Sequence, residues 1–165
     1  EAELFLEHGA DGIAFGFLKA DRTVDAEKTK KMVELIHVKG GEAVFHRAFD
    51  VTPEPEKAIE TMIDCGVNRL QQAKASEGAT LLAELQNKYG DKIELLAGSG
   101  VNAGNVRELM EKTGIRQIHS SCKSYRMDST TETGSVSYAY LSDPHRMDYE
   151  CVDVELVKAL AAQIR

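Results

Sequence analysis

The sequence predicts an α/β domain built on a parallel β-sheet, and three observations carry this prediction. An amphipathic segment that ends at a glycine and continues into a short β-rich run occurs five times. Helical and strand-like segments alternate in units of about 25 to 30 residues, which is typical of a parallel sheet covered by helices. Of the 165 residues, 42% are apolar and 28% are charged, the balance of a single globular domain over 1–165.

Glycines mark the ends of the predicted helices. Each lies where a left-handed backbone conformation would end a helix, a conformation that costs glycine nothing. The five positions are Gly9, Gly40 or Gly41, Gly66, Gly90 and Gly114. The β-rich runs that follow them are the predicted strands, and the fifth leads into a long segment, 122–150, without helical periodicity. We expect this irregular segment to be either a lid over the site, or a solvent-facing insertion or subunit contact.

The predicted helices fill the intervals between these strands. Asp25 can cap one helix, and Thr52 followed by Pro53 can start the next. Three more are predicted over about 76–88, 103–112 and 152–164. The chain begins inside a helix, so we expect upstream units to be missing. Because the strand VNRL passes directly into a polar segment, we also expect a short loop to be missing between Leu70 and Gln71.

Two architectures fit this pattern. An open flavodoxin-like sheet of five strands suits the length, whereas a TIM (β/α)8 barrel needs eight units and typically about 250 residues. In a barrel, the chain would hold the C-terminal five βα units, the irregular loop and a terminal helix. The three N-terminal βα units would be absent.

Residues that follow the strands are the candidate site residues, because active sites of parallel α/β folds lie at the carboxyl ends of the strands. The candidates, in strand order, are Asp21; His46, Arg47 and Asp50; Gly98, Ser99 and Gly100; and His119, Ser120, Ser121 and Cys122.

The segment AGSGVNAGNV is a candidate anion site. Its glycines allow close approach of the backbone to a ligand, and the N–H groups of the following helix favour an anion. A tight turn without a ligand is the alternative. Asp21 can join an acid/base pair or form a turn.

His46 and Arg47 point to opposite faces of their strand, so we expect only one of them to face the site. His46 can act as a general base, bind a metal or pack between layers. With His119 and Cys122 it would offer imidazole and thiolate donors to Cu(I) or Zn(II), although the spacing matches no standard metal motif.

Charge and cysteine content restrict the partners. The formal net charge of −7 argues against nucleic acid and anionic membrane surfaces, and no apolar run approaches the roughly 20 residues of a membrane span. A metal ion, a small anionic ligand or a protein is the expected partner. Three cysteines without CxxC spacing favour a reducing compartment, and we expect Cys65 to be a small buried side chain.

The segments GIAFGFLKADRTVD, VFHRAFD, AGSGV and IHSS occur in order with barrel-like spacing, and together they resemble the CutC copper homeostasis family. The resemblance implies a TIM barrel, a cytoplasmic location, a homo-oligomer and a role in copper homeostasis with copper binding. It carries site roles to the strand-end residues named above, apart from Cys122. Where the family pattern has RxLTSG, this chain has Arg69, Leu70 and Gln71, which leaves that edge of the site undefined.

Three functions follow as hypotheses. The first is a copper-binding or copper-handling protein. The alternative is a barrel enzyme that acts on a small anionic or phosphorylated metabolite, with the 98–102 turn as the anion site. The third is a structural role with the 122–150 segment as an interface.

Overall fold

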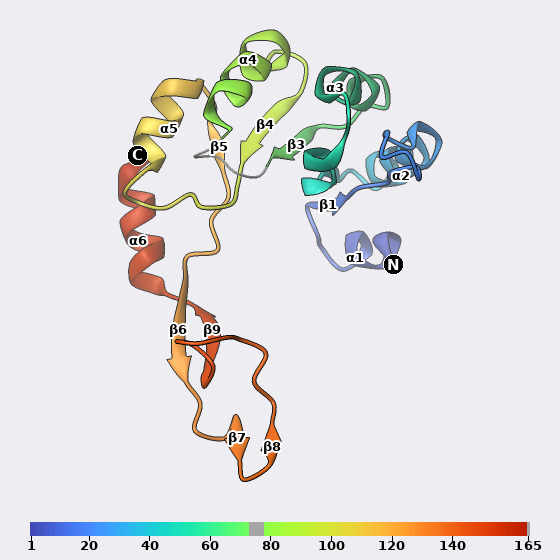
Figure 1. Ribbon diagram of the computed structural model, residues 1–165. Helices are drawn as coiled ribbons and strands as arrows, with labels where there is room; N and C mark the ends of the chain where they lie inside the picture. Colours follow the sequence, from blue (N-terminus) through green and yellow to red (C-terminus); the bar gives the residue numbers. More distant parts are fainter. Residues whose placement is uncertain (73–77, 165) are drawn as a thin grey trace.

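The computed structural model describes residues 1–72 and 78–164 and shows a curved, five-stranded parallel sheet (Figure 1). Its strands follow one another in chain order: β1 (Gly12–Phe15), β2 (Glu42–Phe45), β3 (Arg69–Gln72), β4 (Glu94–Ala97) and β5 (Gln117–Ile118). The predicted parallel α/β sheet is therefore confirmed. The sequential strand order is that of a barrel segment and not the 2-1-3-4-5 order of a flavodoxin-like sheet.

Helices connect the strands and lie along the outer side of the sheet (Figure 1). They are α1 (Ala2–Glu7), α2 (Ala26–Val38), the 3-10 helix η1 (Arg47–Val51), α3 (Pro55–Asp64), α4 (Ala79–Tyr89), α5 (Val106–Thr113) and α6 (Val154–Gln163). Asp25 caps α2 as predicted, accepting a hydrogen bond from the Lys28 backbone N–H at 3.1 Å. Helix α3 begins later than expected, because η1 occupies the chain before it and Pro55 takes the first helical turn.

Four of the five glycine positions have the predicted left-handed conformation, with φ of +92° at Gly9, +76° at Gly40, +82° at Gly66 and +73° at Gly114. The prediction for Gly90 is wrong, because its φ is −64°. Here the chain leaves α4 through a right-handed turn in which the Lys92 and Ile93 N–H groups bond to the Tyr89 carbonyl. Glycine is required for space instead, since a Cβ would lie 2.5 Å from the Gln86 carbonyl oxygen.

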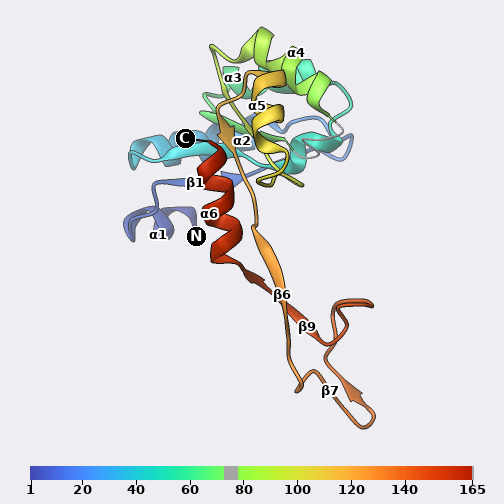
Figure 2. The same ribbon diagram turned by 90° about the vertical axis from the view of Figure 1, so that its left-hand side faces the viewer.

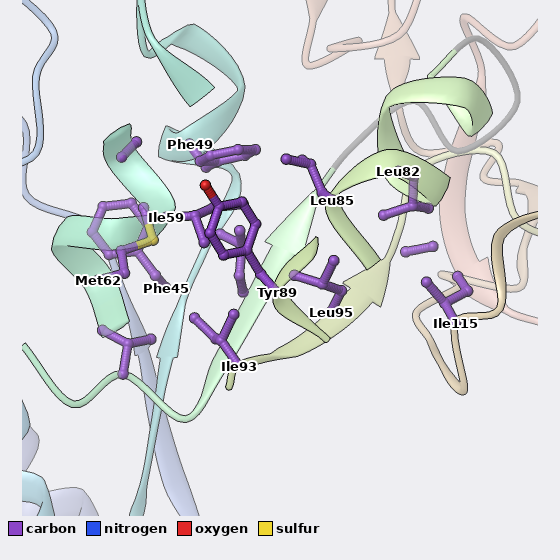
Figure 3. Packing of buried hydrophobic residues seen from close by; sticks show 14 of the residues in the cluster. Phe45, Phe49, Ile59, Met62, Leu82, Leu85, Tyr89, Ile93, Leu95 and Ile115 are labelled. Atoms are coloured by element: carbon purple, nitrogen blue, oxygen red, sulfur yellow. The ribbon is translucent and has the colours of Figure 1, made fainter. Parts of the chain in front are cut away.

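The apolar core lies between the outer face of the sheet and its helices (Figure 3). Alternate strand residues such as Phe45, Leu70 and Leu95 are buried on this face. Ile59 and Met62 of α3 pack against them and are fully buried. Cys65 is also buried, as predicted.

The opposite, inner face of the sheet carries a row of polar side chains, which we call the inner belt: Glu42, Arg69, Glu94 and Gln117. Arg69 lies between two carboxylates, with Nε 2.6 Å from Glu94 Oε2 and Nη2 3.1 Å from Glu42 Oε2. Gln117 donates from Nε2 to Glu94 Oε1 at 2.7 Å. The belt therefore links four adjacent strands, one residue from each.

Residues 123–152 form an elongated arm that projects away from the sheet in both views (Figures 1 and 2). Its base is an antiparallel pair, β6 (Lys123–Met127) with β9 (Asp148–Val152), and its tip holds β7 (Glu132–Thr133) and β8 (Val136–Ser137). The expectation of an irregular loop is wrong for these residues. Because the arm points away from the sheet, it does not form the lid that was one of the two alternatives.

Strand β3 runs without interruption through Leu70 and Gln71, which pair with Leu95 and Leu96 of β4. The expectation that the strand ends at Leu70 is therefore wrong, whereas the missing loop stays a prediction. The start predicted for the next helix, near 76, lies outside the described residues. Within the two described ranges, no helix is both long enough and apolar enough to cross a bilayer.

Candidate ligand pocket at the carboxyl edge of the sheet

A pocket of about 550 Å3 opens at the carboxyl ends of β3, β4 and β5. Its walls are residues 99–103 after β4, residues 119–123 after β5, Arg47 of η1, Gln71 of β3, and Leu156 and Leu160 of α6. This volume lies within the range of small-molecule sites. The topology thus brings three of the predicted strand ends to one cavity.

The turn after β4 is the predicted glycine-rich segment, and its own side chains hold it in place. Ser99 and Gly100 both have left-handed backbone conformations, with φ of +63° and +79°. The Gly100 carbonyl oxygen accepts hydrogen bonds from Asn102 Nδ2 at 3.1 Å and from Asn105 Nδ2 at 2.8 Å. Because Asn105 is the N-cap of α5, the helix begins at Val106, three residues later than predicted. Gly98 is buried just before this turn.

The segment after β5 is tied to its neighbours through side chains. His119 Nδ1 lies 2.9 Å from Gln71 Nε2, an amide nitrogen that donates this hydrogen bond to the imidazole. The Ser120 hydroxyl donates to the Val101 carbonyl at 2.6 Å and accepts from the Cys122 N–H at 3.3 Å. Ser120 therefore joins the two walls of the pocket, a structural use of a residue predicted to bind ligand. Ser121 is an exposed part of the lining.

His46 and Arg47 both follow β2, which ends at Phe45, and they have separate roles at the start of η1. His46 caps η1, its Nδ1 accepting from the Ala48 N–H at 3.1 Å, and it packs where Gly16 leaves no room for a Cβ. Arg47 lines the pocket and pairs with Asp50, Nε to Oδ2, at 3.3 Å. Of these two neighbours, the structure brings Arg47 to the site, whereas His46 supports the segment that carries it.

Asp21 has the role of a turn former. Its Oδ1 accepts from the Thr23 N–H at 2.9 Å and from the Thr23 hydroxyl at 2.7 Å. The Thr23 hydroxyl is the main cause that holds the pKa of the Asp21 carboxyl below its ordinary value, so this group stays ionised. Asp21 does not belong to the lining of the pocket.

The charges around the pocket differ from those of the whole chain. Arg47 and Lys123 line it, and none of the described lining residues is an aspartate or a glutamate, although the chain carries a formal charge of −7. Such a cavity concentrates anions relative to the rest of the surface. Sequence reasoning missed Lys123 and Gln71. No local signal in the sequence marks Lys123, because β6 is largely exposed on both faces.

Side chains that commonly bind metal ions are few around the pocket. Among the described residues, no group of three or more histidine, cysteine, aspartate or glutamate side chains is placed to hold a metal ion. Of the three predicted soft donors, His119 and Cys122 line the pocket and His46 does not. All three cysteines are free thiols, and Cys65 Sγ donates to the Ala26 carbonyl at 3.5 Å, inside the core.

The fold and the pocket define a TIM-barrel-like α/β protein with a pocket at the carboxyl edge of its sheet. The sequence pattern of the CutC family matches residues 2–124, and curated relatives with this family name are more than 30% identical, so the chain belongs to the CutC family.

Two of these relatives are the CutC family proteins of Treponema denticola and Bacteroides thetaiotaomicron. The first is 36% identical over 142 residues, which cover 84% of this chain and 57% of the relative. The second is 41% identical over 143 residues, which cover 83% of this chain and 56% of the relative. This chain thus spans about half the length of the curated relatives it matches.

A solved structure from Streptococcus agalactiae, described as a candidate copper homeostasis protein CutC, is similar in three dimensions. The TM-score is 0.65 at 25% sequence identity, with 72% of this chain and 59% of the other covered. Together with the sequential parallel sheet, this similarity confirms the expected TIM-barrel type of fold.

Proposed function

We propose that this chain serves in copper homeostasis and holds copper, as cargo, at the pocket described above. Membership of the CutC family and the description of the S. agalactiae protein support this proposal. The observation that carries it is that His119 and Cys122 line one cavity. Thiolate suits Cu(I) and imidazole suits copper in general, so two such donors give the ion a first pair of ligands.

Titration of the purified protein with Cu(I), without oxygen and against a competing chelator, tests this proposal. We expect the His119→Ala and Cys122→Ser variants to bind copper about tenfold more weakly or worse. Matched controls are His8→Ala and Cys151→Ser. His8 is exposed just after α1, Cys151 lies on the arm, and neither lines the pocket. Equal affinity in all four variants would contradict the proposal, as would a lack of binding by the unmodified protein.

A second candidate function is binding or conversion of a small anionic metabolite, such as a phosphate ester. The observation that favours it is that two cations, Arg47 and Lys123, line the pocket beside the turn at Ser99 and Gly100. None of the described lining residues carries a carboxylate. A guanidinium can hold a phosphate or carboxylate with two hydrogen bonds. The volume of about 550 Å3 suits an organic ligand better than a bare ion.

Isothermal titration with inorganic phosphate and with a sugar phosphate tests the second candidate. We expect Arg47→Gln to weaken binding about tenfold, because a charged hydrogen-bond donor is lost. Arg107→Gln is the control, since Arg107 is exposed on α5 and does not line the pocket. If the unmodified protein binds neither compound, this candidate is wrong and the copper proposal is unaffected.

We also infer that the protein works in the cytoplasm as a homo-oligomer. Three free thiols support a reducing compartment. Tyr138 and Tyr140, which are 79% and 68% exposed, support a contact surface on the arm. Light scattering after size-exclusion chromatography checks the assembly. The test variant has a short turn in place of residues 128–147. Its assembly should have half the mass of the unmodified assembly or less, after correction for the mass of the deleted residues.

A further inference from the structure

The base of the arm is also a wall of the pocket. Lys123, the first residue of β6, lines the cavity, and Cys122 before it has a φ of +41°, which turns the chain from β5 into the arm. The Asp153 N–H, just after β9, donates to the Cys122 carbonyl at 2.8 Å and closes the base. Movement of the arm at this point therefore changes the shape of the pocket.

The two cations of the pocket have carboxylate partners of different origin. Arg47 pairs with Asp50, three residues away in the same short helix. Lys123 pairs with Glu150 on the other strand of the arm, Nζ to Oε1, at 2.5 Å. The hydrogen bond that Lys123 donates to the Glu150 carboxylate is the main cause that raises the pKa of the Lys123 ammonium, which therefore stays charged.

Glu150 connects Lys123 to the more distant part of the arm. The Glu150 backbone N–H donates to the Tyr140 hydroxyl at 3.3 Å, and Glu150 lies opposite Tyr125 in the β6–β9 ladder. Both side chains of the Lys123–Glu150 pair keep partial contact with solvent, with 46% and 36% of their surface exposed. The ammonium can therefore turn from the carboxylate to a second acceptor without a large rearrangement.

We propose that Lys123 sets the affinity of the pocket for anions and that Glu150 opposes this binding by holding the same ammonium. This inference rests on the second candidate function above. An anion that enters the pocket competes with the Glu150 carboxylate for the Lys123 ammonium. Binding in the pocket and attachment of Lys123 to β9 are thus thermodynamically coupled, and the coupling acts in both directions.

A double-mutant cycle with inorganic phosphate as the probe, read by isothermal titration, tests the coupling. Glu150→Gln should tighten phosphate binding about threefold to fivefold, the range expected for a solvent-exposed ion pair. Lys123→Gln should weaken it about tenfold, because a charged donor is lost. In the Lys123→Gln background, Glu150→Gln should have no further effect, since Glu150 acts through Lys123.

The pair Lys158–Glu155 on α6 is the matched control. Its charged atoms are 2.8 Å apart, both side chains are exposed, and neither residue lines the pocket. Lys158→Gln and Glu155→Gln should leave phosphate affinity unchanged. If Glu150→Gln tightens binding equally with and without Lys123, the carboxylate acts as a diffuse charge and the proposal is overturned.

The outcomes separate this inference from the function on which it rests. If the unmodified protein gives no binding heat with phosphate, the anion function itself fails and the inference fails with it. If the unmodified protein binds phosphate but Lys123→Gln binds it equally well, the anion function stands and only the role of Lys123 is refuted. Circular dichroism of each variant establishes that the fold is retained.

Discussion

Substitution of Gly16 by alanine should destabilise the protein by displacing His46. A Cβ on Gly16 would lie 2.4 Å from His46 Cε1, 2.6 Å from His46 Nδ1 and 2.9 Å from the Ala48 Cβ. Such an overlap costs about 1–3 kcal/mol, and loss of the bond from the Ala48 N–H to His46 removes a cap worth about 1 kcal/mol. The backbone of Gly16 is not left-handed, so alanine can adopt its conformation. Because alanine also restricts the unfolded chain, it adds about 0.7 kcal/mol to the free energy of unfolding. The free energy of unfolding should therefore fall by about 1.3–3.3 kcal/mol.

Urea denaturation followed by circular dichroism measures this change, and the His46→Ala background provides the decisive comparison. Without the imidazole, the two shortest overlaps of the new methyl group are absent, and only the 2.9 Å contact with the Ala48 Cβ remains. Gly16→Ala should then cost less than it does in the unmodified protein. The reasoning is refuted if Gly16→Ala is as stable as the unmodified protein. It is equally refuted if the loss is the same in both backgrounds.

Three further predictions concern the core, a cap and a titrating group. Ile59→Ala should lower the free energy of unfolding by about 2–5 kcal/mol in urea, because Ile59 is fully buried. Asp153→Ala should cost about 1 kcal/mol in the same assay, since Asp153 accepts from the Glu155 N–H at 2.8 Å and caps α6. The hydrogen bond from the Lys28 side chain is the main cause that holds the pKa of Asp25 below its ordinary 3.8. The ionised Asp25 carboxylate stabilises the fold fully at pH values above 3.8, its ordinary pKa. This stabilisation is lost as the pH falls through the lower pKa of Asp25 in the folded protein. The stability difference from Asp25→Asn should therefore shrink below about pH 4, and a pH-independent difference would contradict this.

The sheet could be predicted from the sequence because each strand and helix carries its own local signal. Gly66 and Gly114 end helices by a conformation that few other residues adopt, and the apolar runs after them fit one buried face. The arm could not be predicted in this way. Tyr125 and Tyr149 lie on a ladder that is largely solvated on both faces, so burial imposes no alternation of apolar and polar residues.

The site could be predicted only as a set of strand ends. Chain topology brings the ends of β4 and β5 together, so Ser99 and His119 were identified from position alone. Lys123 reaches the same cavity because the backbone at Cys122 has a left-handed conformation. Cysteine rarely adopts this conformation, so the sequence does not indicate a turn there. Alternation indicated that His46 and Arg47 could not both face the site, but the structure was needed to show that Arg47 does.

The inner belt has a consequence for how the strands align. The strands contain only two to four residues, so few backbone hydrogen bonds distinguish one alignment from the next. A slip of one residue would turn Arg69 toward the apolar outer layer and separate it from Glu42 and Glu94. Burying such an unpaired charge costs several kcal/mol, more than the short ladder can recover. The ion pairs of the inner belt thus favour the native register of β2, β3 and β4 over registers shifted by one residue.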